Sequence, residues 1–208
     1  MSGRFISLEG GEGAGKSTQA RALAAAIEAR GLDVVATREP GGSPGAEAIR
    51  GLLMQGSVDR WQPRAEMLLF AAARADLVER TIRPALARGA WVICDRYIDS
   101  TRAYQGAAGG LSDEEIMAVH RVGSGGLLPD RTILLDMPID TGRDRAAARD
   151  GAAADRFAAR GEAFHNAVAA GFRRFAEAEP ARFRVIDANG SPQVVGEAVL
   201  AAVADLLP

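Results

Sequence analysis

A glycine-rich loop near the amino terminus constrains the fold of this chain more than any other feature of its sequence. Residues 10–17, GGEGAGKS, match the pattern GxxxxGK[ST] completely. The loop follows a short apolar run at residues 5–9, typical of a β-strand, and precedes a helical pattern at residues 19–30 that ends at Gly31. This strand–loop–helix context favours a phosphate-binding loop over its alternative, a glycine-rich turn capped by Ser17.

The chemistry of the loop suits a nucleoside triphosphate. Glycines let successive backbone N–H groups point inward at phosphate oxygens, and the start of the next helix adds its positive dipole end. Lys16 is predicted to bridge the β- and γ-phosphates, and the Ser17 hydroxyl to join the shell of a Mg²⁺ ion. The predicted ATP-binding residues are Gly10, Gly11, Glu12, Gly13, Ala14, Gly15, Lys16, Ser17 and Thr18.

Apolar runs alternate with helical patterns along all 208 residues. Strands are predicted at 5–9, 34–38, 91–95, 131–136 and 182–187, and helices at 44–55, 64–88, 112–122, 140–178 with an interruption around 150–151, and 193–207. The strand runs are mostly apolar throughout, which indicates a parallel sheet with helices on both faces. Without a repeat or a linker, residues 1–208 are predicted to form a single three-layer α/β domain.

Composition narrows the class of protein. A formal net charge of −2 argues against a dedicated nucleic-acid binder. No apolar run approaches the roughly 18 residues that a membrane helix needs, and the amino terminus lacks a signal-peptide pattern. The single cysteine, Cys94, excludes an internal disulfide, and no cluster of histidines and cysteines suggests a metal other than Mg²⁺. A cytoplasmic protein without a nucleic-acid or membrane partner is expected.

A phosphate-binding loop alone does not distinguish kinases from switches and motors. Among 25 basic residues Lys16 is the only lysine, so the guanine-reading NKxD motif of Ras-like GTPases is absent. Motor and transport ATPases are normally larger or fused to further domains. A small-molecule kinase is therefore predicted. The alternatives are a kinase for another nucleotide or nucleoside, or an ATP-dependent switch or assembly factor with slow hydrolysis.

Two pairs of residues suggest an acceptor site. Asp95 ends a predicted strand, where open α/β sheets bind ligands, and its carboxylate can hold Mg²⁺ through water. Arg96 follows it and can clamp a phosphate with two hydrogen bonds. Phe70 and Arg74 share one helix face, which can offer a stacking surface and a donor to a pyrimidine. On the residues alone, Asp95 and Arg96 could instead form a surface pair at a helix start. For an arbitrary helix, a core phenylalanine beside a surface arginine is the favoured interpretation of Phe70 and Arg74.

Four segments, in order, resemble bacterial thymidylate kinases: TREPGG at 37–42, LLFAAAR at 68–74, DRY at 95–97 with STRAYQG at 100–106, and PD…LLD at 129–136. The resemblance extends from Arg4 to about Asn189. It implies the P-loop kinase fold with strand order 2-3-1-4-5 and a homodimer packed through helices. It also implies transfer of the γ-phosphoryl group of ATP to dTMP, giving dTDP and ADP in dTTP synthesis.

The same resemblance assigns roles on the acceptor side. Phe70 would stack on thymine, Arg74 would contact its O4, and Glu12 would accept a hydrogen bond from the sugar 3′-OH. Tyr104 would crowd the ribose 2′ position and so favour deoxyribose. The full set implied for dTMP is Glu12, Arg38, Phe70, Arg74, Arg96, Ser100, Thr101, Tyr104 and Gln105, with Arg38 and Arg96 on the phosphate. An acid within an anion-binding loop is electrostatically unfavourable, which by itself indicates a functional role for Glu12; the alternative is a solvent-facing acid. Without the resemblance, Arg38 is a solvated strand end and residues 100–105 are an ordinary polar loop.

The charge for catalysis is expected from Lys16, Arg96, Mg²⁺ and a lid at about residues 143–157. Some family members carry an arginine within the P-loop, where this chain has Gly13. The predicted lid arginines are Arg149, Arg145 and Arg156, the first two on one helical face. A solvated Arg/Ala-rich helix is the alternative. Ala158 stands where relatives often have glutamate, so no carboxylate role is carried over to that position.

Overall fold

The computed structural model describes residues 3–150 and 156–208, and the side chains of residues 149 and 150 lie outside the described part. Its five strands are β1 (Phe5–Gly10), β2 (Val34–Arg38), β3 (Trp91–Asp95), β4 (Arg131–Asp136) and β5 (Phe183–Asp187). They form one parallel sheet in the order β2-β3-β1-β4-β5. Both the expected order and the five expected strands are confirmed.

Burial along the strands follows their places in the sheet. The central strand β1 is buried at all six positions, and its neighbours β3 and β4 are buried at every position except the last. The edge strands β2 and β5 are partly exposed. The apolar runs are therefore purest in the three strands that helices cover on both faces.

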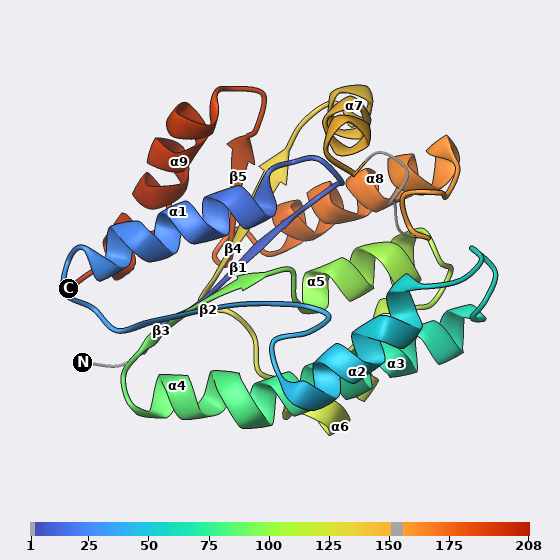
Figure 1. The fold of residues 1–208 in the computed structure, drawn as a ribbon, viewed down its shortest axis with the longest axis horizontal. Coiled ribbons are helices and arrows are strands. Elements are labelled where there is room, and N and C mark those ends of the chain that lie inside the picture. Colours follow the sequence, from blue (N-terminus) through green and yellow to red (C-terminus); the bar gives the residue numbers. More distant parts are fainter. Residues whose placement is uncertain (1–2, 151–155) are drawn as a thin grey trace.

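Helices form a layer on each face of the sheet (Figure 1). On one face lie α1 (Lys16–Glu28) and α9 (Pro192–Ala201), which share an apolar core with β1, β3 and β4. On the opposite face lie α3 (Pro63–Leu77), α4 (Arg83–Ala87) and α6 (Asp113–Ser124). Farther along that face, α8 (Glu162–Ala178) packs on β4 and β5. α2 (Pro44–Met54) packs along α3, and α7 (Ile139–Asp150) follows β4.

The predicted last helix, 193–207, ends at Ala201 and is followed by a 3₁₀ turn, Ala204–Leu206. Two further helical segments differ from the sequence expectation. The predicted helix 64–88 consists of α3, a π-helical turn Val78–Ile82 and α4, and the wider turn precedes Pro84, which has no N–H to donate. The polar stretch after β3 is not a loop. It forms α5 (Ile98–Thr101) and a π-helical segment, Arg102–Ala107, because buried Asp99 pairs with Arg102 and with Arg182 from the turn before β5.

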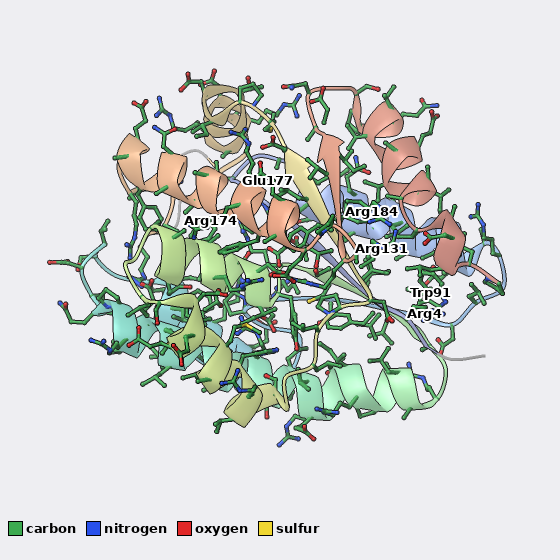
Figure 2. All side chains as sticks on the ribbon, turned by 180° about the vertical axis from the view of Figure 1, so that it is seen from behind. Arg4, Trp91, Arg131, Arg174, Glu177 and Arg184 are labelled. Carbon is green, nitrogen blue, oxygen red and sulfur yellow. The ribbon has the colours of Figure 1, made fainter. Side chains whose placement is uncertain are left out.

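The two ends of the parallel strands serve different purposes. At the amino ends, buried Arg131 donates to the Ala202 carbonyl and pairs with Asp205 at 2.8 Å, which ties the sheet to the carboxyl-terminal segment (Figure 2). At the carboxyl ends, the backbone register places Asp95 beside Leu8 on one side and Arg38 on the other. The glycine-rich loop begins at these carboxyl ends, directly after β1. None of the helices in residues 3–150 and 156–208 combines the length and apolar character that crossing a bilayer requires.

Candidate active site

The glycine-rich loop runs from the end of β1 into the first turn of α1. Gly13 and Gly15 have φ values of 67° and 87°, in the left-handed region that residues with a Cβ rarely adopt. No side chain caps the N-terminus of α1, so its first backbone N–H groups remain for a ligand. A helix start of this kind attracts anions, because its free N–H groups and its dipole both carry positive charge.

Lys16 lies within this loop and is nearly buried, with 7% of its surface exposed. Its Nζ donates to the Gly11 carbonyl at 2.5 Å, so the side chain folds back over the loop. Burial, and next the positive charge of Arg96, lowers the pKa of Lys16 to about 7. Nearby carboxylates, that of Asp95 foremost, oppose this lowering of the pKa, and a phosphate brought into the loop would add further negative charge beside the ammonium.

Ser17 and Asp95 meet beside Lys16. The Ser17 hydroxyl donates to the Asp95 carboxylate, although the two residues lie on α1 and β3. Strand pairing between β1 and β3 holds Asp95 next to the loop. A hydroxyl and a carboxylate are hard oxygen ligands of the kind that Mg²⁺ prefers, and such sites use few protein ligands because Mg²⁺ keeps several waters. The two residues therefore fit the predicted magnesium site.

A central cavity of about 110 Å³ lies between α3, α5 and the loop after β2. Its lining residues come from six parts of the chain: Glu12, Glu39, Pro40, Arg50, Met54, Phe70, Arg74, Arg96, Tyr97, Ser100, Thr101, Tyr104, Gln105 and Phe157. The structure thus brings together eight of the nine residues predicted to bind dTMP. The ninth, Arg38, does not line the cavity, because its guanidinium pairs with Glu47 at 3.0 Å on the exposed side.

Arg96 connects the central cavity to the glycine-rich loop. Its guanidinium donates to the Gly10 carbonyl at 3.2 Å, to Ser100 Oγ at 3.0 Å and to Tyr104 Oη at 3.3 Å. Its φ of 69° is the only positive value among the described non-glycine residues, and this conformation costs energy for a residue with a Cβ. These three hydrogen bonds stabilise the unfavourable backbone conformation and place the Arg96 guanidinium between the glycine-rich loop and the central cavity.

Arg74, from α3, lines the central cavity. It forms an ion pair with Glu39 at 2.8 Å and donates to Thr101 Oγ1 at 2.7 Å, and both charged side chains are at most 4% exposed. Burial raises the pKa of Glu39 to about 7, although the Arg74 charge opposes that rise. Phe70, one helical turn earlier, presents its ring to the same cavity.

Buried acids are the part of the site that sequence reasoning missed. Glu9 accepts hydrogen bonds from the Tyr97 N–H at 2.7 Å and Ser100 Oγ at 2.6 Å, and burial, then the Asp99 charge, raises its pKa to about 8. Glu66 accepts a bond from Gln105 at 2.8 Å. These acids position the cavity side chains. Their one sequence signal is a carboxylate placed within or beside an apolar run, as in the FISLEG segment of β1.

Arg156 lies elsewhere than the lid interpretation expects. It is 3% exposed and donates to the Leu53 carbonyl at 2.6 Å and the Val58 carbonyl at 3.1 Å, and its third nitrogen pairs with Glu66. All of its guanidinium nitrogens are thus engaged beside α2 and α3, not at the glycine-rich loop. The reason is tertiary: carbonyls near the end of α2 and a buried acid on α3 meet at this point. The next residue, Phe157, lines the central cavity at 5.8 Å from the Phe70 ring.

The P-loop cleft is a second depression at the glycine-rich loop, and it shares no lining residue with the central cavity. It is lined by Gly13, Ala14, Gly15, Thr18, Gln19, Arg145, Ala188, Asn189, Gly190, Ser191, Pro192 and Val195. Arg145 reaches it from α7 and donates to the Ala188 and Asn189 carbonyls at 3.0 and 3.2 Å. The side chain of Arg149 and residues 151–155, which belong to the expected lid, lie outside the described residues.

Fold and site together define a P-loop phosphotransferase with two neighbouring binding places. A sequence profile of the thymidylate kinase family matches residues 8–199. The chain is 64% identical to the thymidylate kinase of Rhizorhabdus wittichii over the full length of both chains, and 55% identical to that of Caulobacter vibrioides over 99% of this chain and 96% of the relative. A crystal structure of thymidylate kinase from Ehrlichia chaffeensis superposes with a TM-score of 0.79 at 30% identity, covering 98% of this chain and all of the other. The chain belongs to the thymidylate kinase family.

Proposed function

We propose that the central cavity binds dTMP and the P-loop cleft binds ATP, so that the chain makes dTDP and ADP in dTTP synthesis. Membership of the thymidylate kinase family gives the reaction, which is ATP-dependent phosphorylation of dTMP. The observation that carries the residue assignment is Arg96, which lines the cavity while it donates to the P-loop carbonyl of Gly10. A phosphate held by Arg96 in the cavity would lie next to the loop that cradles the donor.

The transfer needs no nucleophile from the protein, because the acceptor phosphate oxygen is already anionic near neutral pH. Catalysis is then positioning of the two phosphates plus stabilisation of charge on the transferring group. Lys16 and Arg96, which donate to the neighbouring Gly11 and Gly10 carbonyls, supply positive charge at the loop. Ser17 and Asp95 would hold Mg²⁺, which neutralises charge on the β- and γ-oxygens when bound. The proposal also includes a single domain with a lid at about residues 143–157. Within that lid, Arg145 and Arg149 would help to stabilise charge on the transferring phosphoryl group.

Base recognition is assigned to the α3 side of the cavity. Phe70 would stack on thymine, and Arg74, fixed by Glu39 and Thr101, would donate to O4 from a preset position. The Arg96 guanidinium carbon lies 5.1 Å from the centre of the Tyr104 ring, which holds the ring in place. The Tyr104 side chain would then limit the room for a 2′-hydroxyl. Glu12 lines the same cavity and would accept from the 3′-OH.

Arg38 belongs to this proposal only if its present ion pair opens. Its partner Glu47 and Arg38 itself are about half exposed, and such pairs contribute on the order of 1 kcal/mol or less. A dianionic phosphate offers the guanidinium a stronger partner. We therefore keep Arg38 as a phosphate ligand that exchanges Glu47 for dTMP.

The proposal includes a cytoplasmic homodimer, as the family resemblance implies. Two large apolar side chains support a helical interface: Leu68 on α3 is 54% exposed and Val122 on α6 is 90% exposed. These helices pack against each other, so both side chains belong to one helical layer. Sedimentation equilibrium would give a dimer mass, and Val122→Lys would shift the protein toward monomer.

A coupled ADP-release assay tests the function. With ATP and Mg²⁺, we expect rapid ADP release when dTMP is added and much slower release with dCMP, dGMP or ribo-TMP. Turnover that ignores the acceptor would identify an ATPase. Preference for another monophosphate would identify a kinase of different specificity.

A further inference from the structure

Two glycines bring helix α7 into direct backbone contact with the P-loop. A Cβ built on Gly142 would lie 2.5 Å from the Glu12 carbonyl oxygen, and one on Gly13 would overlap the Gly142 carbonyl. Real Cβ atoms essentially never approach another atom within 3.0 Å. Neither position can therefore carry a side chain unless α7 moves away from the loop.

This contact also buries part of the largely exposed helix α7. Among the α7 residues whose burial is described, only Gly142 and Ala146 are buried. Ala146 faces α8 across a largely apolar cavity. The place of α7 at the glycine-rich loop therefore depends on how closely Gly142 approaches the peptide that joins Glu12 to Gly13.

The face of α7 that touches the P-loop also carries Arg145. Gly142 and Arg145 are three residues apart, so they lie on the same side of the helix. Arg145 lines the P-loop cleft with Gly13 and Gly15, and its two hydrogen bonds reach the loop after β5 across that cleft. Moving α7 outward at Gly142 moves the base of Arg145 with it.

We propose that Gly142 is a positioning residue for phosphoryl transfer: it seats α7 on the P-loop and thereby sets the place of Arg145 at the donor phosphates. The inference rests on the proposed function, in which the P-loop cleft holds ATP. An alanine at position 142 requires a withdrawal of about half an ångström or more to relieve the Glu12 contact. Displacements near 1 Å cost about a hundredfold in well-organised active sites. We expect Gly142→Ala to lower kcat about tenfold or more.

The matched control is Gly51→Ala. Gly51 is also a helix glycine, in α2, and a Cβ there meets no atom within 4 Å. Both substitutions improve helix propensity equally, so the difference between the variants reports the P-loop contact alone. We expect Gly51→Ala to keep wild-type kcat, and both variants to keep the circular dichroism and a Tm close to that of wild type.

Binding measurements separate positioning from a general structural defect. By calorimetry, Gly142→Ala should weaken ADP binding at least threefold and leave dTMP binding within about twofold, because the displaced helix borders the donor side. Equal losses for ADP and dTMP, or a variant indistinguishable from Gly51→Ala, would overturn the inference. The dissociation constants test the role of Gly142 even if the wild-type protein does not phosphorylate dTMP. Failure of wild type to phosphorylate dTMP would refute the proposed function instead.

A double-mutant cycle tests the route through Arg145. If Gly142 acts by placing Arg145, then Gly142→Ala should have little further effect on kcat in an Arg145→Ala background. Strictly additive losses in the two backgrounds would show that Gly142 and Arg145 act independently, and that part of the inference would be abandoned.

Discussion

Removing the Arg74 guanidinium would leave Glu39 as an unpaired carboxylate inside the protein. Glu39 is 4% exposed at its side chain, and Arg74 supplies both its ion pair and its hydrogen bonds. Breaking a buried pair by deleting one partner typically costs about 3–5 kcal/mol. We expect Arg74→Ala to lose stability in this range at pH 8 and to bind dTMP weakly.

The pH dependence identifies the cause. Burial raises the folded-state pKa of Glu39 to about 7, above its ordinary value, so the folded protein holds this proton more tightly than the unfolded chain does. Its contribution to stability is therefore intact at low pH and declines as the pH rises toward 7. Without Arg74 the folded pKa rises further, and the decline continues above pH 7. The loss caused by Arg74→Ala should be about 1 kcal/mol larger at pH 8 than at pH 5.5, since one pKa unit corresponds to about 1.4 kcal/mol.

Urea unfolding of wild type and variant at both pH values measures this difference. The double variant Glu39→Met with Arg74→Met should recover most of the stability, because two apolar side chains replace the pair, but it should not recover dTMP binding. A loss that is the same at pH 5.5 and pH 8, or a double variant less stable than Arg74→Ala, would refute the reasoning.

Three further predictions concern the donor side, the base and the lid. Burial lowers the pKa of Lys16 to about 7, and bound phosphates would raise it again, so ATP binding at pH 8 should take up a proton. Calorimetry in buffers of different ionisation enthalpy measures this uptake. Lys16→Ala should abolish the uptake and most of the phosphoryl transfer, and an unchanged kcat would refute the P-loop assignment. Phe70→Ala should raise KM for dTMP at least tenfold, whereas Phe164→Ala, a ring that packs on Tyr104 outside the cavity lining, should change it less than threefold; equal effects would contradict stacking on Phe70. Arg149→Ala should lower kcat strongly and leave the affinity for dTMP nearly unchanged, since arginine fingers raise kcat on the order of a thousandfold. Arg145→Ala should have the next largest effect on kcat. Values of kcat within a few-fold of wild type for both variants would exclude the lid mechanism.

Local patterns determined the framework of this protein. The loop at residues 10–17, its flanking strand and helix, and the five apolar strand runs follow from residue types within short stretches of chain, because glycine conformations and apolar periodicity act locally. The segments TREPGG and STRAYQG then pointed to the family, which gave the strand order and the residues around the central cavity. Eight of the predicted dTMP residues do line that cavity.

Only the tertiary structure decided which charged groups face each other. Arg156 contacts Glu66, ninety residues away in sequence, although the lid interpretation expected it at the transferring phosphate. Arg38 pairs with Glu47, although the family resemblance implied that it binds the dTMP phosphate. The contact of Gly142 with the Glu12 carbonyl has no distinct local pattern, because it arises where separate segments pack. The apolar run around Glu9 signals a buried acid, but its partners on α5 and the turn before it are set by the fold. A sequence specifies the charge of a side chain, but its partner, its burial and its pKa depend on what the completed fold brings beside it.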